Sequence, residues 1–289
     1  MQLSQLVDMY SPAAVLEEVK SIFVCSYSIR DFADVRAVYR DFLDLYGGRY
    51  PGYCACNTRY HDTMHITDSL LAMARLIDGY NLTHKKLPVR LAALGLIAAL
   101  LHDTGFIQNV RDRKGTGAKY TLTHVNRSIE FAKVYFLKRN FSGSDARIAA
   151  NALLCTDLLV PVENIKFRTP PERTVGLMLG SADLLGQMAS RCYLERLLFL
   201  YREFREGHVA GYSSELEMLR KTLGFSRLMD HRLAVTLENM RRYVRVHFKK
   251  KYGINRDLYR DAIRGQLNFL ENTVLNSPHK YRKLLRRTK

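Results

Sequence analysis

Proline and glycine are scarce in this chain, with seven prolines and seventeen glycines among 289 residues. Because these residues mark turns, their scarcity disfavours a many-turned β architecture and favours long helices. No alternation of apolar and polar residues is long enough to build a sheet, and no internal repeat or low-complexity linker occurs. The sequence therefore predicts an all-α fold.

The chain also has little that suggests export or membrane insertion. Its first residues, MQLSQLVDMYSPAAVLEEVK, lack the basic segment followed by an apolar segment that marks a secretory signal. The longest apolar run, Leu91 to Leu101, has about half the length that crosses a bilayer. We expect this run to form a buried core helix and the protein to be soluble and cytoplasmic.

Cysteine is likewise sparse and odd in number, with Cys25, Cys54, Cys56, Cys155 and Cys192. An odd count without a secretion signal indicates reduced thiols. One residue separates Cys54 from Cys56, which is neither a redox CxxC motif nor the usual spacing of a structural zinc site. We expect all five cysteines to be structural.

The chain carries an excess of positive charge, with a net charge of +17 and a pI near 9.8. Such a charge attracts anions. It does not distinguish between nucleotides, nucleic acid and an acidic surface.

Hydrophobic periodicity divides the chain into helices and loops. The pattern predicts one domain over residues 1–289, with a catalytic core at about 60–206 and a basic helical C-terminal extension at about 213–289. A partly separate extension remains an alternative. Helices are expected from Val15 to Phe23, at 31–46, from Tyr60 onward, after Pro88, and at about 122–138, 144–155, 172–189, 191–206 and from Ser213; a polar loop is expected at 107–120.

Two histidines stand at the start of the helix predicted after Tyr60. His61 and His65 are four residues apart, so on a helix they share one face and can address the same small volume. The alternative is a helix surface with two solvated histidines.

Two further elements place ionisable residues in apolar surroundings. His102 and Asp103 end the run LAALGLIAALLHD, and Asp183 follows the apolar stretch from Leu177 to Leu179. Burying such groups is costly unless a cation or several hydrogen-bond donors satisfy them. A divalent cation is one such partner. The alternatives are a helix end that merely reads His-Asp and a buried Asp–Arg pair.

Taken in order, these elements resemble the HD superfamily of metal-dependent phosphohydrolases. The chain is more closely similar to class I cyclic-nucleotide phosphodiesterases over roughly residues 60–206. The similarity rests on three segments: Tyr60-His61-Asp62 with His65, Cys155-Thr156-Asp157, and Ala182-Asp183-Leu184. It implies an HD-domain, phosphodiesterase-like helical bundle with additional N- and C-terminal helices.

The resemblance also implies roles for individual residues. The metal ligands would be His65, His102, Asp103 and Asp183, with Asp103 bridging to a second ion. His61 would protonate the leaving oxygen, with Asp103 also at the catalytic centre. His124 and Asp157 would stand behind the ligands or bind the second ion.

The implied activity is cleavage of a phosphoester, of a nucleotide or cyclic nucleotide, by water that the metal activates. One or two divalent ions are expected, and the mixed nitrogen and oxygen ligands leave Mn, Fe, Zn, Ni and Mg open. Arg111, Arg113 and Lys119, in the loop after His-Asp, are candidate phosphate ligands; an ordinary solvated loop is the alternative.

Several positions depart from the phosphodiesterase pattern. Asp62 replaces an asparagine, and Thr104-Gly105-Phe106 follows Asp103 where that family has a histidine three residues on. The glutamine that holds a purine has no assigned counterpart, although Gln187 and Gln266 are present. The branch that cleaves cyclic dinucleotides is disfavoured, because no Gly-Tyr-Pro triplet occurs. Phosphohydrolase activity is therefore a firmer expectation than cyclic-nucleotide specificity.

The C-terminal region suggests a second class of function. A weakly catalytic HD scaffold that binds nucleic acid or a protein partner through basic residues is the alternative to an enzyme. Interleaved aromatic residues would add base stacking on a single strand. A solvated helix face is the simpler interpretation of the same residues, and a homodimer through apolar helix faces remains open. The basic residues are Arg241, Arg242, Arg245, Lys249, Lys250 and Lys251, then Lys280, Arg282, Lys283, Arg286, Arg287 and Lys289; the aromatic residues are Tyr243, Phe248, Tyr252 and Tyr281.

Overall fold

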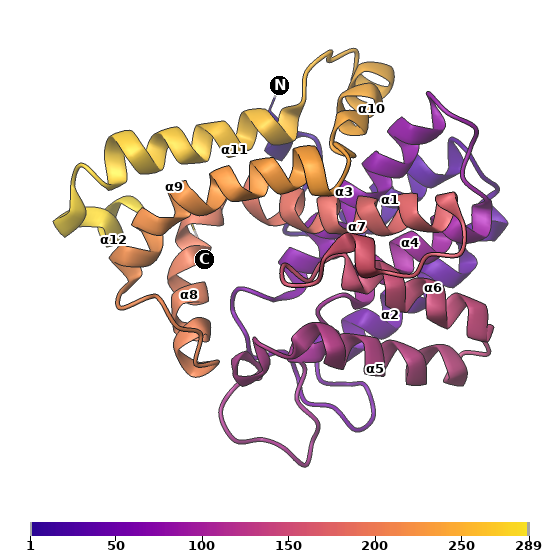
Figure 1. The fold of residues 1–289 in the computed structure, drawn as a ribbon, viewed down its shortest axis with the longest axis horizontal. Coiled ribbons are helices and arrows are strands. Elements are labelled where there is room, and N and C mark those ends of the chain that lie inside the picture. Colours follow the sequence, from indigo (N-terminus) through magenta and orange to yellow (C-terminus); the bar gives the residue numbers. More distant parts are fainter. Residues whose placement is uncertain (1, 288–289) are drawn as a thin grey trace.

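The structure is a computed structural model that describes residues 2–287 (Figure 1). It is 68% helical, and these residues contain no β-strand, so the all-α prediction is confirmed. Lys289, which belongs to the second basic stretch, lies outside the described residues. The described helices are α1 (Pro12–Val24), α2 (Ala33–Tyr46), α3 (Thr63–Asn81), α4 (Val89–Leu101), α5 (His124–Lys138), α6 (Gly143–Leu154), α7 (Pro170–Ala189), α8 (Tyr193–Glu206), α9 (Glu215–His231), α10 (Arg242–Tyr252), α11 (Leu258–Phe269) and α12 (Tyr281–Leu284).

Helix α3 is the centre of the fold. It packs most extensively against α7 and also contacts α1, α4 and α10 (Figure 1). The sequence pattern indicates a helix with one apolar face, but α3 is buried on nearly all sides, including the polar residues Ser69 and Asp78. Its neighbours cover the faces that the sequence pattern leaves to solvent.

Helix α4 is the buried core helix that its composition predicts. All eleven residues from Leu91 to Leu101 are buried, against α2, α3, α6 and α7. The segment Val89–Phe106 is long and apolar enough to cross a membrane, but 83% of it is buried inside the protein. It therefore has the surroundings of a buried core helix.

Local sequence signals place several helix starts. Ser142, Thr169 and Ser214 each accept a hydrogen bond from a backbone N–H in the first turn of α6, α7 and α9. These bonds satisfy donors that a helix end otherwise leaves unpaired. The observed boundaries lie within about two residues of the expected ones for these elements.

The C-terminal helices pack on the core. Helix α10 lies against α3, and α11 contacts α7 and α10. Gly79 allows the closest approach, because a Cβ at this position would stand 1.9 Å from the carbonyl oxygen of Tyr243. Tyr243 and Phe248 point into this interface and are buried. The expectation that they are available for base stacking is therefore wrong.

All five cysteines are free, as expected. Burial raises the pKa of Cys56 to about 11 and that of Cys155 to about 12. Both thiols are therefore protonated and weakly reactive at neutral pH.

Candidate metal centre

The N-terminus of α3 positions His65. Asp62 precedes the first helical residue, Thr63, and its Oδ1 accepts a hydrogen bond from the His65 backbone N–H at 3.1 Å. Arg196 holds the same carboxylate at 2.7 Å. His61 consequently lies outside the helix, and the expectation that His61 and His65 share a helical face is wrong. The two rings are nevertheless close, with centroids 5.7 Å apart.

The C-terminus of α4 positions the His-Asp doublet. Thr104 Oγ1 donates to the carbonyl oxygen of Leu101 at 2.8 Å, which satisfies one of the last helical acceptors. His102 Nδ1 donates to the carbonyl oxygen of Ala99, also at 2.8 Å. His102 is 1% exposed and Asp103 is 3% exposed. In the neutral ring, His102 Nε2 therefore carries a lone pair and faces the protein interior.

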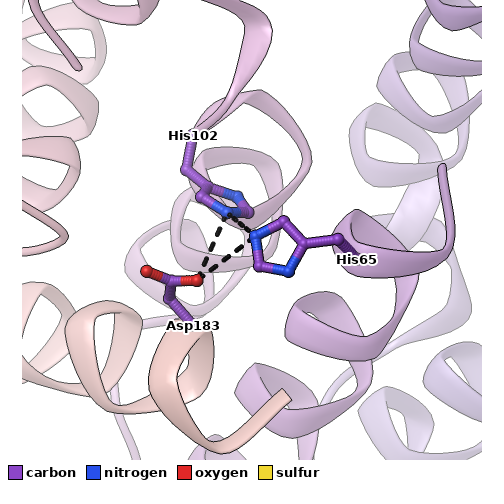
Figure 2. Close-up of side chains that lie close together, drawn as sticks. All are labelled: His65, His102 and Asp183. Atoms are coloured by element: carbon purple, nitrogen blue, oxygen red, sulfur yellow. Dashed lines mark hydrogen bonds and ion pairs between the residues drawn. The ribbon is translucent and has the colours of Figure 1, made fainter. Parts of the chain in front are cut away.

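The fold brings the four expected ligands close together, and Figure 2 shows three of them, His65, His102 and Asp183. His65 Nε2 lies 3.1 Å from His102 Nε2, 3.0 Å from Asp103 Oδ2 and 3.3 Å from Asp183 Oδ1. His102 Nε2 lies 3.4 Å from Asp103 Oδ2 and 3.7 Å from Asp183 Oδ1. Ligand atoms about 2.0–2.2 Å from one ion lie roughly 3.0–3.5 Å apart at tetrahedral or octahedral angles. The spacing thus fits one divalent cation held by His65, His102 and Asp183, with Asp103 Oδ2 beside the two histidines.

The hydrogen bonding of the cluster is incomplete in a way that also fits a cation. Asp103 Oδ2 is buried and has no hydrogen bond of acceptable geometry. Burial alone would lower the pKa of His65, but the Asp103 and Asp183 carboxylates raise it to about 10. The single proton on His65 Nε2 lies near acceptors of His102, Asp103 and Asp183. It cannot form a hydrogen bond of good geometry to all three. A divalent ion held by His65, His102 and Asp183 would leave no such shortage of hydrogen-bond donors in this group.

His124 approaches the cluster from α5. Its Nδ1 donates to the carbonyl oxygen of Thr121 at 2.6 Å, and its Nε2 lies 3.7 Å from Asp103 Oδ1. Burial lowers the pKa of His124 and favours the neutral ring. Gly105 permits this approach, since a Cβ there would stand 1.9 Å from the carbonyl oxygen of His124.

His61 stands beside the cluster with one nitrogen already engaged. Its Nδ1 donates to Glu203 Oε2 at 2.7 Å, and Glu203 Oε1 accepts the backbone N–H groups of Arg59 and Tyr60 at 2.7 and 2.6 Å. The His61 ring stacks on Phe106 with centroids 4.0 Å apart. These contacts fix the plane of the imidazole and leave Nε2 for chemistry.

A cavity of about 350 Å³ opens onto this site. His61, His65, Asp103 and Asp183 line it, as does Asp157. Asp157 Oδ1 accepts a hydrogen bond from the Leu159 backbone N–H, so this carboxylate shapes the cavity wall. The cavity has the volume of a small-molecule site.

The two glutamines noted in the sequence have different positions. Gln187 lines the cavity, accepts a hydrogen bond from the Tyr60 hydroxyl at 2.8 Å and donates to Asp183 Oδ1 at 3.3 Å. Gln266 donates to the carbonyl oxygens of Ser190 and Arg191. Gln187 therefore helps to orient the Asp183 carboxylate, which its sequence position does not reveal.

The candidate phosphate ligands lie elsewhere. Arg111, Arg113 and Lys119 are not among the described residues that line the cavity. Arg113 Nε donates to the Val110 carbonyl oxygen, and Lys119 pairs with Asp112. We leave all three out of the proposed site.

Glu203 is the site residue that the sequence does not indicate. It lies near the end of α8, in Tyr-Arg-Glu-Phe, a segment typical of an amphipathic surface helix. It is buried, unlike most glutamates. Only the packing of α8 beside residues 59–61 shows that its carboxylate meets His61.

In comparisons with known proteins, no family model, no curated protein and no solved structure matches the chain.

Proposed function

We propose that this protein is a metal-dependent phosphohydrolase that cleaves a phosphoester. The observation that carries the proposal is the convergence of His65, His102, Asp103 and Asp183 on one small volume at the base of a cavity. These groups come from α3, the C-terminal end of α4 and α7, and a purely structural ion pair needs no open cavity beside it. The resemblance to the HD superfamily points to the same chemistry.

In this proposal, the contacts of each residue indicate its role in the reaction. His65, His102, Asp103 and Asp183 hold a divalent ion, and His124 faces the second oxygen of Asp103. When bound, such an ion supplies Lewis acidity toward a phosphoryl oxygen and a nucleophilic water at neutral pH.

His61 is the proton donor in this proposal. Because its Nδ1 is bonded to Glu203, Nε2 holds the proton that passes to the departing oxygen. The Glu203 carboxylate stabilises the protonated imidazole and orients it, as an acidic partner does for a catalytic histidine elsewhere.

The test measures metal content and turnover together. We expect the purified protein to bind about one or two equivalents of a divalent metal and to hydrolyse bis(4-nitrophenyl) phosphate or a nucleotide phosphoester in its presence. His102→Ala should lose both properties, whereas His279→Ala, at an exposed histidine, should keep both. Protein that binds none of Mn, Fe, Zn, Ni and Mg would refute the proposal.

A second candidate function has its own supporting observation. Helix α10, the start of α11 and the residues between them line a groove of about 510 Å³. Its lining contains six arginines and two aspartates, a composition that suits the phosphate backbone of a nucleic acid. The arginines are Arg241, Arg242, Arg245, Arg256, Arg260 and Arg264.

This candidate is tested by binding to single-stranded RNA at several salt concentrations. Arg260→Glu combined with Arg264→Glu should weaken binding at least tenfold and reduce the salt dependence, while Arg40→Glu on α2 should have a smaller effect. Equal affinity for all three proteins would exclude the groove as the binding surface.

A further inference from the structure

The walls of the cavity above the metal centre are mainly apolar. Phe106 and Leu184 lie near the base, and residues from α8 and α9, including Leu200, Phe204 and Phe225, form the opposite wall. Apolar side chains facing an open cavity gain free energy when a ligand covers them. The walls therefore favour a substrate with a sizeable apolar part.

The charges in the same cavity limit how many phosphates a substrate carries. Lys221 is the only lysine or arginine among the described residues that line it, and its Nζ lies 2.8 Å from Glu217 Oε1. Asp103, Asp157 and Asp183 line it too. A ligand with two or three phosphates would face these carboxylates with little compensating positive charge beyond the metal centre. A single phosphoryl group suits the site better.

The outer part of the cavity extends the apolar surface to solvent. Leu122, Leu158 and Leu159 line the cavity and are 67%, 45% and 86% exposed. They come from two loops that precede α5 and follow α6. Exposed leucines that continue a cavity wall indicate a binding surface more specifically than scattered surface leucines do.

From these observations we infer that the substrate is an amphiphilic phosphoester with one phosphoryl group and an alkyl, prenyl or comparably apolar substituent. The phosphoryl group lies at the metal centre, and the apolar substituent lies between α8, α9 and the leucine rim formed by Leu122, Leu158 and Leu159. This inference rests on the proposed phosphohydrolase activity for its reaction and on the cavity for its specificity.

The experiment compares phosphodiesters that share a 4-nitrophenyl leaving group and differ in an alkyl chain from methyl to octyl. All are held below their micelle concentrations and assayed with the metal-loaded full-length protein. We expect kcat/KM to rise about fourfold for each methylene that enters the cavity, until the cavity is filled. An activity that is flat or falls along the series overturns the inference and leaves the proposed function standing.

Binding of non-hydrolysable methylphosphonate and octylphosphonate, measured by calorimetry, separates the two hypotheses. If no ester is hydrolysed but octylphosphonate binds at least tenfold more tightly than methylphosphonate, the proposed function fails and the cavity's specificity stands. Equal binding of the two phosphonates together with absent turnover overturns both.

The leucine rim supplies variants with a matched control. Leu122→Ser combined with Leu159→Ser should lower the octyl-to-methyl ratio of kcat/KM, or of phosphonate affinity, at least fivefold. Leu137→Ser changes a leucine on α5 that is 77% exposed and not among the described cavity residues, so it should leave the ratio unchanged. Equal ratios in the rim variant and the control would remove the leucine rim from the binding site.

Discussion

At the scale of single residues, the partners of His61 and His65 decide what each imidazole can do. His65 has its Nε2 among carboxylates and another imidazole, a position suited to a metal ligand. His61 has Nδ1 on Glu203 and its face on Phe106, a position suited to proton transfer. The two histidines are four residues apart in sequence, and their contacts suit them to different roles.

Glu203 provides the first prediction. Glu203→Gln keeps the size of the side chain but removes the charge that stabilises protonated His61, so kcat should fall about 10- to 100-fold. Because Glu203 does not contact the metal ligands directly, metal content should be unchanged. The alkaline limb of the kcat–pH profile, where the proton donor loses its proton, should shift to lower pH. Glu271→Gln, at an exposed glutamate, should leave that profile unaltered. A lower kcat with an unshifted profile would indicate a purely structural role.

Asp68 provides a pH-dependent prediction. It lines a second cavity, of about 380 Å³, between α3, α7 and residues 3–10, where burial raises its pKa from 3.8 to about 7 although Arg196 opposes the shift. The folded protein therefore binds more protons than the unfolded chain between about pH 4 and pH 7, and this residue's contribution to stability decreases as the pH rises through that window.

Asp68→Asn removes this contribution. The melting temperature of the variant relative to the native protein should increase by roughly 4 °C between pH 5 and pH 8. Thermal denaturation followed by circular dichroism at both pH values measures the difference. Parallel curves for the two proteins would show that Asp68 ionises normally in the folded state.

At the scale of elements, the contact between α3 and α10 depends on the absence of a side chain at Gly79. Gly79→Ala would place a Cβ 1.9 Å from the Tyr243 carbonyl oxygen, which forces the helices apart. The expected cost is about 3 kcal/mol in the free energy of unfolding.

Gly265 is the matched control for this prediction. It lies within α11, and a Cβ there would have no heavy atom within 4 Å. Gly265→Ala should therefore stabilise the protein by about 0.5–1 kcal/mol through helix propensity. Urea denaturation of both variants measures the two effects, and equal changes would show that α10 does not approach α3 this closely.

At the scale of the whole molecule, the C-terminal helices complete the core. His247 and Phe248 of α10 are fully buried, and His247 Nδ1 lies 2.7 Å from Asp78 Oδ2 on α3. Tyr259 of α11 accepts a hydrogen bond from Arg75 at 2.9 Å. These contacts favour a single cooperative unit over a catalytic core with a separate extension.

Truncation tests this view. A fragment ending at residue 212 would expose the α3 face that α10 covers, and each fully buried apolar side chain contributes about 1.5–3 kcal/mol. Losing several exceeds much of a typical stability margin. The fragment should lack a cooperative thermal transition, whereas removing only residues 277–289 should leave one at a lower temperature. A cooperative transition in the 1–212 fragment would show that the extension folds separately.

Much of the secondary structure follows from the sequence, because helical periodicity and capping residues act locally. The apolar run ending in His102-Asp103 and the acid at Asp183 are recognisable for the same reason: ionisable groups in apolar surroundings need a partner. The tertiary structure alone decides which groups meet. In the folded protein Glu203 contacts His61, and His61 lies outside α3. Tyr243 and Phe248 are buried in the core. Leucines line the cavity, whereas Arg111, Arg113 and Lys119 are not among the described residues that line it. These outcomes depend on contacts between residues far apart in the chain, which local pattern does not encode.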